Sequence, residues 1–179
     1  MWYASSGVPV LPLHTGLGGG RCSCRRPHCD RPGKHPRLRH GLTDATTDPR
    51  RIEMWWTRWP EANIGLRTGV AMDVADIDSA EGWHGLRHLL GGAMPDGPEV
   101  RTGGGGRHFW FRPTGYGNRV RLLPGVDWRG AGGYVIAPPS TITTSPFIKL
   151  FRSLTMNAAY SASSSGRPSL PADVQKSCI

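Results

Sequence analysis

The sequence predicts a single mixed α+β domain followed by a low-complexity tail. Its 179 residues are enough for one domain with its own core. Its 25 glycines and 16 prolines favour a fold with many turns over a helical bundle. Short apolar runs of strand character alternate with two stretches of helical periodicity. We expect residues 1–152 to form the domain and residues 153–179 to be disordered, because that tail is rich in Ser, Ala, Pro and Gly without periodicity.

The charge balance points to a polyanionic partner. Lysine and arginine number 22 against 13 acidic residues, which gives a net charge of +9. A basic surface attracts nucleic acid most often, although a charge excess can also serve solubility alone. The sequence contains neither an 18-residue apolar run nor a signal-peptide pattern. We therefore expect a cytoplasmic protein without a membrane partner.

The segment 20–38 carries a predicted metal site. Its cysteines and one histidine follow the spacing C-x-C-x4-C-x5-H, and almost no apolar residue is present to hold the loop. A structural zinc ion would fold such a loop outright. The alternative is a redox pair with a spare thiol, or free cysteines, but a reducing compartment favours metal. His28 is a competing ligand that adjoins a cysteine, and Cys178 is distant in sequence. The expected ligands are Cys22, Cys24, Cys29 and His35.

A helix is predicted after this loop. Asp48 and Pro49 are a start signal, because a capping side chain followed by proline favours the first turn, and Pro60 ends the helix. Its apolar residues recur at spacings of three and four: Ile52, Trp55, Trp56 and Trp59. Tryptophans can stack on bases, but such a stripe is more often core. Strands are expected at 8–13, near an edge because of its prolines, and at 62–67.

The strand over residues 70–78 ends in paired acids. Asp76 and Asp78 lie two apart and therefore share one face of the strand, whereas Asp73 has the opposite parity. Two close carboxylates repel each other unless a cation lies between them, and a hard divalent ion is one solution. Solvated acids at a strand end are the simpler alternative.

The second half of the domain is predicted to contain a helix at 80–90 and several short strands. A strand at 99–102 is followed by four glycines, which either bind phosphate through their backbone amides or form a plain hairpin loop. The next strand carries His108. Asp127 and Arg129 lie on the first arm of an expected hairpin over 125–137.

Together these motifs resemble the bifunctional DNA primase/polymerase N-terminal domain, a branch of the archaeo-eukaryotic primase superfamily. The resemblance covers about residues 8–145 in the family's order and spacing. The matching stretches are DATTDP (44–49), the WW helix (55–56), NIGLRTG (63–69), DID (76–78), TGGGGRH (102–108), PGVDWRG (124–130) and GGYVIAPPS (132–140). Two departures are the very short segment before Val8 and the sequence after Ser140, which lacks the usual glycine and aromatic residues.

The resemblance implies a catalytic core related to the RNA-recognition fold, with an α/β unit in front and a zinc-binding loop. It implies template-directed nucleotidyl transfer with two Mg²⁺ or Mn²⁺ ions, bound by Asp76, Asp78 and Asp127. His108 would contact the phosphates of the incoming NTP or dNTP, together with Gly104, Gly105 and Gly106, and Arg129 would be a further nucleotide contact. The expected partners are a single-stranded DNA template and a replicative helicase, in the replication of a plasmid, phage or mobile element. The alternatives are a non-catalytic, zinc-bearing DNA-binding module, from a truncated or decayed primase/polymerase, and a metal-dependent phosphohydrolase.

Overall fold

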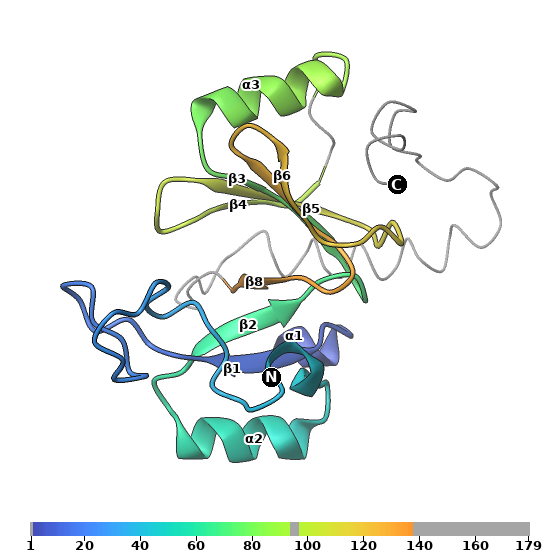
Figure 1. Cartoon of the computed structure of the whole chain (residues 1–179). Helices are drawn as coiled ribbons and strands as arrows, with labels where there is room; N and C mark the ends of the chain where they lie inside the picture. The colour runs from blue at the N-terminus through green and yellow to red at the C-terminus, as the bar shows by residue number, and fades with distance from the viewer. Residues whose placement is uncertain (1, 94–96, 138–179) are drawn as a thin grey trace, which may run out of the picture.

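The structure is a computed structural model that describes residues 2–93 and 97–137. Two antiparallel sheets lie between two helices, so that the layers run α2, three-stranded sheet, five-stranded sheet and α3 (Figure 1). The helical elements are α1 (Trp2–Ser5), the 3₁₀ turn η1 (Gly41–Asp44), α2 (Pro49–Arg58) and α3 (Ala80–Leu89). The strands are β1 (Val10–Leu13), β2 (Asn63–Arg67), β3 (Asp73–Ile77), β4 (Glu99–Arg101), β5 (Arg107–Phe111), β6 (Arg119–Leu123), β7 (Val126–Arg129) and β8 (Tyr134–Ile136).

The three-stranded sheet has the order β1-β2-β8 and is covered by α2. The helix predicted to start at Asp48 and Pro49 is confirmed as α2. The Asp48 side chain accepts a hydrogen bond from the Arg50 amide at 2.9 Å, and Pro49 occupies the first turn. Trp55 is buried, as the core interpretation predicts, while Trp56 is only partly buried. The edge position predicted for the first strand is also confirmed.

The five-stranded sheet has the order β4-β5-β3-β7-β6, and every pairing within it is antiparallel. Helix α3 begins after Ser79, whose hydroxyl accepts the Gly82 amide at 3.0 Å. Its buried face packs on one side of the sheet in a cluster made of Ala75, Ile77, Leu86, Phe109, Val126 and Trp128. Residues of β3 with the parity of Ala75 therefore face α3.

The main core lies between the two sheets. Val74, Val100 and Trp110 come from the five-stranded sheet. They pack with residues of the three-stranded sheet and its surroundings, among them Val8, Val10, Ile52, Leu66, Met72 and Val135. Every second residue of β3 therefore points toward the other sheet, beginning with Val74. Asp76 has the parity of Val74, so the face that forms this core continues into the acidic residues.

The hairpin predicted over residues 125–137 is wrong. Strand β7 pairs with β3 and β6, while β8 crosses to the other sheet and pairs with β2. The crossing is fixed by Thr68, whose hydroxyl donates to the Gly130 carbonyl at 2.7 Å and whose amide donates to the Gly133 carbonyl at 3.0 Å. The true hairpin partner of β7 is β6, an irregular edge strand whose exposed residues lack strand-like alternation. Arg121 adopts a φ of 56° there.

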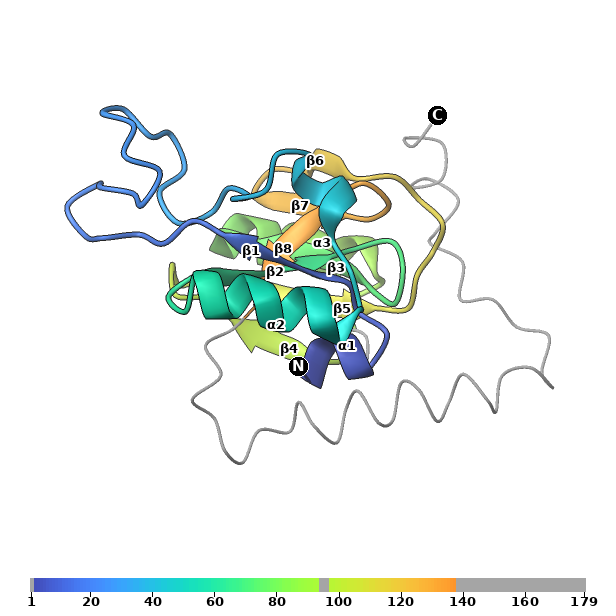
Figure 2. The same ribbon diagram turned by 90° about the horizontal axis from the view of Figure 1, so that it is seen from below.

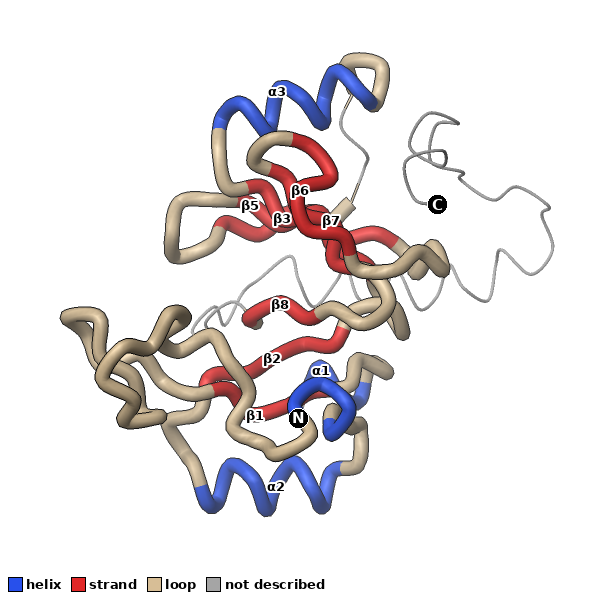
Figure 3. Tube along the Cα trace, viewed as in Figure 1, coloured by secondary structure: helices blue, strands red, loops and turns tan. Residues whose placement is uncertain are grey.

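The predicted α+β class is confirmed as a mixture of helices and antiparallel sheets. The relation of the core to the RNA-recognition fold stays a prediction. The connection from β1 to α2 is almost entirely loop (Figure 3), and part of it projects from the body of the domain (Figure 2). The predicted tail and Cys178 lie outside the described residues. Within the described ranges, no helix combines the length and the apolar character that crossing a membrane requires.

Candidate active site

The register of the five-stranded sheet brings the predicted catalytic residues together. Asp76 on β3 lies directly opposite Asp127 on β7 and directly opposite His108 on β5. Directly opposed residues of antiparallel strands share a face, with Cβ atoms about 4.5–5.5 Å apart. The predicted convergence of Asp127 and His108 on Asp76 is therefore present in the structure. Asp78 follows the end of β3 with the same parity.

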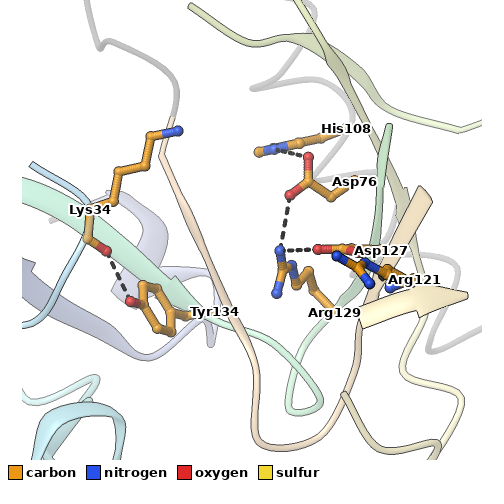
Figure 4. Close-up of polar contacts among 7 residues, drawn as sticks. All are labelled: Lys34, Asp76, His108, Arg121, Asp127, Arg129 and Tyr134. Atoms are coloured by element: carbon orange, nitrogen blue, oxygen red, sulfur yellow. Dashed lines mark hydrogen bonds and ion pairs between the residues drawn. The ribbon is translucent and has the colours of Figure 1, made fainter. Parts of the chain in front are cut away.

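Polar contacts link these side chains into one network (Figure 4). His108 Nε2 lies 3.2 Å from Asp76 Oδ1. The guanidinium of Arg129 lies 2.5 Å from Asp127 Oδ2 and 3.5 Å from Asp76 Oδ2. The second oxygen of Asp127 accepts the Arg121 amide at 2.7 Å. Each carboxylate oxygen of Asp76 and Asp127 thus has a donor, and Arg129 is the cation between the two acids.

The pKa shifts of the acids reflect this arrangement. Burial alone raises the pKa of Asp76, but His108 and Arg129 outweigh it and lower that pKa below the usual carboxyl range. The pKa of Asp78 is raised, first by burial and then by the negative charges of Asp76 and Asp127. The three carboxylates therefore influence one another electrostatically. At Asp78 the neighbouring positive charges do not offset burial and the two other negative charges.

Asp73 points to the other face of β3, as its parity predicts. Its side chain is fully buried, and Oδ2 accepts the amide of Thr114 at 2.7 Å and its hydroxyl at 2.6 Å. Burial raises the pKa of Asp73, and the Thr114 hydrogen bonds only partly offset that rise. Asp73 therefore anchors the loop after β5 and lies apart from the other acids.

The four glycines form the turn of the β4–β5 hairpin, the plainer of the two predicted arrangements. The amide of Thr102 donates to the Gly106 carbonyl at 2.9 Å, and the amide of Gly105 donates to the Thr102 carbonyl at 3.0 Å. The Gly105 amide is used inside the turn in this structure, and phosphate binding by Gly104, Gly105 and Gly106 stays a prediction. A Cβ on Gly106 would lie 2.6 Å from the Ile77 carbonyl oxygen and 3.4 Å from Asp78 Oδ1. The turn therefore lies directly against the end of β3.

The predicted zinc ligands form a compact cluster in the projecting loop. One ligand atom from each of Cys22, Cys24, Cys29 and His35 lies within 4.8 Å of all the others. His35 Nε2 lies 3.5 Å from the sulfurs of Cys22 and Cys29. Tetrahedral zinc with Zn–S of ~2.3 Å and Zn–N of ~2.0 Å would separate sulfur and nitrogen by about 3.5 Å. This cluster could therefore bind zinc, and the exposed His28 is not part of it.

Neighbouring groups support the metal-binding state of the cluster. Burial by itself raises the pKa of the Cys22 thiol, but hydrogen bonds from the backbone of Cys24 and Gly33 and from His35 lower that pKa to about 6. The His14 ring stacks on the His35 ring at 4.4 Å between centroids. Burial, followed by the charge of His35, lowers the pKa of His14 to about 4, so this outer ring is neutral at pH 7.

The chain matches one protein-family model over most of its length. The family model described as bifunctional DNA primase/polymerase, N-terminal, matches residues 1–154. The chain belongs to this family. A comparison with curated proteins finds no match. The resemblance stated from the motifs is thus confirmed, and membership of the primase/polymerase family implies nucleotidyltransferase activity on a DNA template with nucleotide substrates.

The acidic site of this primase/polymerase domain has the donor chemistry for a divalent ion. Its oxygens are hard ligands, and three carboxylates outnumber the single guanidinium among them. Within residues 2–93 and 97–137, however, the cysteine–histidine cluster is the only group of three or more such ligands that already lies within 4.8 Å. The three acids do not form such a group, and Arg129 contacts one oxygen each of Asp76 and Asp127.

Two further residues beside the site were not anticipated from the sequence. The Tyr134 hydroxyl donates to the Lys34 carbonyl at 2.9 Å, and both residues lie across the site from His108 and Asp76 (Figure 4). The positive charge of Lys34 acts to lower the pKa of Asp78. The sequence gives one signal only, which is that Lys34 immediately precedes a metal ligand. The proximity of Lys34 to the acids arises only in the tertiary structure, so the sequence does not reveal it.

Proposed function

We propose that this domain, spanning about residues 1–152, is a DNA primase and/or polymerase that transfers nucleotides under the direction of a single-stranded DNA template. The observation that carries the proposal is the cross-strand register that places Asp76 opposite both Asp127 and His108, in a chain of the primase/polymerase family. We expect it to serve the replication of a plasmid, phage or mobile element, with a replicative helicase as a partner.

In this proposal Asp76, Asp78 and Asp127 hold two divalent ions, Mg²⁺ or Mn²⁺. When bound, such ions activate the primer 3′ hydroxyl and stabilise the leaving pyrophosphate. The carboxylates orient these groups from one face of a rigid sheet, which limits the reorganisation needed during reaction. Arg129, released from Asp76 and Asp127, becomes free to contact the phosphates of the nucleotide.

His108 and the glycine turn form the proposed triphosphate side. His108 is buried beside Asp76, and its Nε2 points into the site. Gly106 lies beside Asp78 at the end of β3, and Gly104 and Gly105 precede it in the same turn. A backbone amide can bind a phosphate oxygen without a side chain that would keep the ligand away. The assignment of these groups to the triphosphate rests on the family and on this proximity.

The deciding experiment is primer synthesis and primer extension on single-stranded DNA with Mg²⁺ or Mn²⁺. Asp76→Ala and Asp127→Ala should each abolish synthesis, because loss of one ligand misplaces an ion that stabilises charge in the transition state. His108→Ala should mainly weaken nucleotide binding. Asp73→Asn is the matched control on the same strand but the opposite face, and it should retain synthesis per folded molecule.

The same assay distinguishes the alternatives. DNA binding without any synthesis by the wild-type protein would identify a non-catalytic DNA-binding module. Phosphate release from nucleotides without a template would identify a phosphohydrolase. An Asp76→Ala variant that extends primers normally would refute the assignment of the site.

A further inference from the structure

The short segment at residues 33–35 joins the zinc cluster to the acidic site. His35 supplies the imidazole of the cluster. The Gly33 amide donates to the Cys22 sulfur at 3.5 Å, and the Gly33 carbonyl accepts the Asn63 side chain of β2 at 2.9 Å. The Lys34 amide donates to the Arg31 carbonyl at 3.1 Å. The backbone is therefore tied both to the metal ligands and to the three-stranded sheet.

The conformation of Gly33 fixes this segment closely against the loop. Gly33 has a φ of 76°, a region that favours glycine, and a Cβ there would lie 2.7 Å from the Gly16 amide nitrogen. Gly33 is also buried. The position of the next residue, Lys34, is thus set by packing rather than by a freely moving loop.

Lys34 combines this fixed backbone with an unpaired ammonium group. Its carbonyl accepts the Tyr134 hydroxyl from β8 at 2.9 Å. Its side chain is exposed, and none of the salt bridges among the described residues includes it. Figure 4 shows it across the site from Asp76 and His108. Its charge nevertheless reaches Asp78, the acid that follows β3.

We propose that Lys34 binds the phosphates of the incoming nucleoside triphosphate and that zinc, by ordering residues 33–35, holds it in place. This inference rests on the proposed function and adds to it a phosphate contact supplied by the zinc loop. A lysine ammonium is a compact charge with three donors, which suits terminal phosphate oxygens. Lys34 lies across the site from His108, and Asp78, on which its charge acts, lies next to Gly106, so the ammonium is on the open side of the proposed triphosphate position.

The anchoring of the backbone explains why zinc matters for this contact. A lysine on a mobile loop loses conformational entropy when it binds a ligand, whereas a lysine whose main chain is already fixed loses less. The fixed main chain here depends on His35 and on the Gly33 contact to Cys22, and both belong to the metal cluster. Removing zinc should therefore weaken triphosphate binding without touching any group that contacts the nucleotide directly.

The test is calorimetric titration of the full chain with dATP and Mg²⁺ in the absence of DNA. Lys34→Ala should weaken dATP binding about tenfold, and Lys34→Arg should restore part of it. Tyr134→Phe should give a smaller loss, because it frees the Lys34 carbonyl. Arg50→Ala on α2 is the matched control: it removes one exposed positive charge from the outer layer and should leave binding unchanged.

Zinc depletion provides the second arm. A zinc-selective chelator that spares Mg²⁺ should weaken dATP binding to the wild-type protein by a factor close to that of Lys34→Ala. It should have little further effect on Lys34→Ala, because the two changes remove the same contact. An equal loss in both proteins would instead indicate general disordering and would overturn the role of zinc.

Two other outcomes overturn the inference. In one, dATP binding by Lys34→Ala equals that of the wild-type protein. In the other, the variant loses affinity for single-stranded DNA but not for dATP, which would assign Lys34 to the template. Failure of the proposed function is distinguishable, because primer synthesis by the wild-type protein tests it independently of dATP binding by the Lys34 variants.

Discussion

Arg129 occupies the centre of the acidic site, and its replacement tests whether it compensates for missing metal. Arg129→Gln removes the guanidinium that contacts both Asp76 and Asp127 and leaves their charges beside Asp78. The side chains of Arg129, Asp76 and Asp127 are 22%, 17% and 16% exposed. These ion pairs are therefore intermediate between fully buried salt bridges and solvent-exposed ones. Breaking a buried pair costs about 3–5 kcal/mol and a surface pair about 0–1 kcal/mol. We expect a loss of about 2 kcal/mol without metal, or ~4–8 °C in Tm.

Magnesium should reverse much of this loss. A metal that binds only the folded state at about ten times its dissociation constant stabilises by about 1.4 kcal/mol. In Arg129→Gln the ion need not displace a guanidinium, so thermal unfolding should show a larger Mg²⁺-dependent rise in Tm than in the wild-type protein. Arg119→Gln, an exposed arginine on the neighbouring strand β6, is the control and should change neither value.

The pH dependence of the loss provides an independent check. The folded-state pKa of Asp76 is lowered, so its ion pairs stabilise the fold above the ordinary carboxyl pKa, and this contribution is lost as pH falls through the lowered value. The difference in Tm between Arg129→Gln and the wild-type protein should therefore be largest at neutral pH and shrink below about pH 4. Equal stability at neutral pH without metal, or an equal Mg²⁺ response, would refute the reasoning.

Three further outcomes are expected. Purified reduced protein should contain about one zinc per chain by metal analysis. Cys24→Ser should lower that zinc content and increase hydrogen exchange in residues 20–38. Absence of zinc from the reduced protein would contradict the predicted site. Asp78→Asn should raise the metal-free Tm at neutral pH, because the raised folded-state pKa of Asp78 means that its charged form destabilises the fold. This gain in Tm should disappear below the ordinary carboxyl pKa. A lower Tm for the variant at neutral pH would contradict the prediction. Binding to single-stranded DNA should weaken steeply with salt because of the net charge of +9, and salt-insensitive binding in gel shifts would count against phosphate contacts.

The features that the sequence predicted well are those with a local physical cause. Asp48 and Pro49 fix the start of α2, and strand parity alone separates Asp73 from Asp76. The four metal ligands lie within one short loop, so their spacing limits how far apart they can be. In each case the interacting groups are neighbours in the chain, and the rules that govern them are short-range.

The features that were missed depend on contacts between distant segments. The irregular strand β6 has no apolar alternation, because it is an exposed edge with a bulge. Strand β8 leaves β7 for the other sheet because Thr68, far away in sequence, donates hydrogen bonds to the carbonyls of Gly130 and Gly133 at the two ends of the crossing. The place of Lys34 beside the acids requires the zinc loop, β2 and β8 to be assembled first.

The crossing of β8 has a consequence for how the protein is made. Gly65 on β2 pairs with Ile136 on β8, so the three-stranded sheet is completed only after every strand of the five-stranded sheet has been synthesised. During translation the β1–β2 pair therefore has one unpaired edge until β8 is synthesised. The pairing of β2 with β8 joins segments far apart in the sequence, and such non-local pairing slows folding. A chain that stops before Tyr134 would present β2 as a bare edge that can pair with another copy and aggregate. Nascent chains released before this point are therefore candidates for chaperone binding, whereas chains extended past Ala137 can close the sheet.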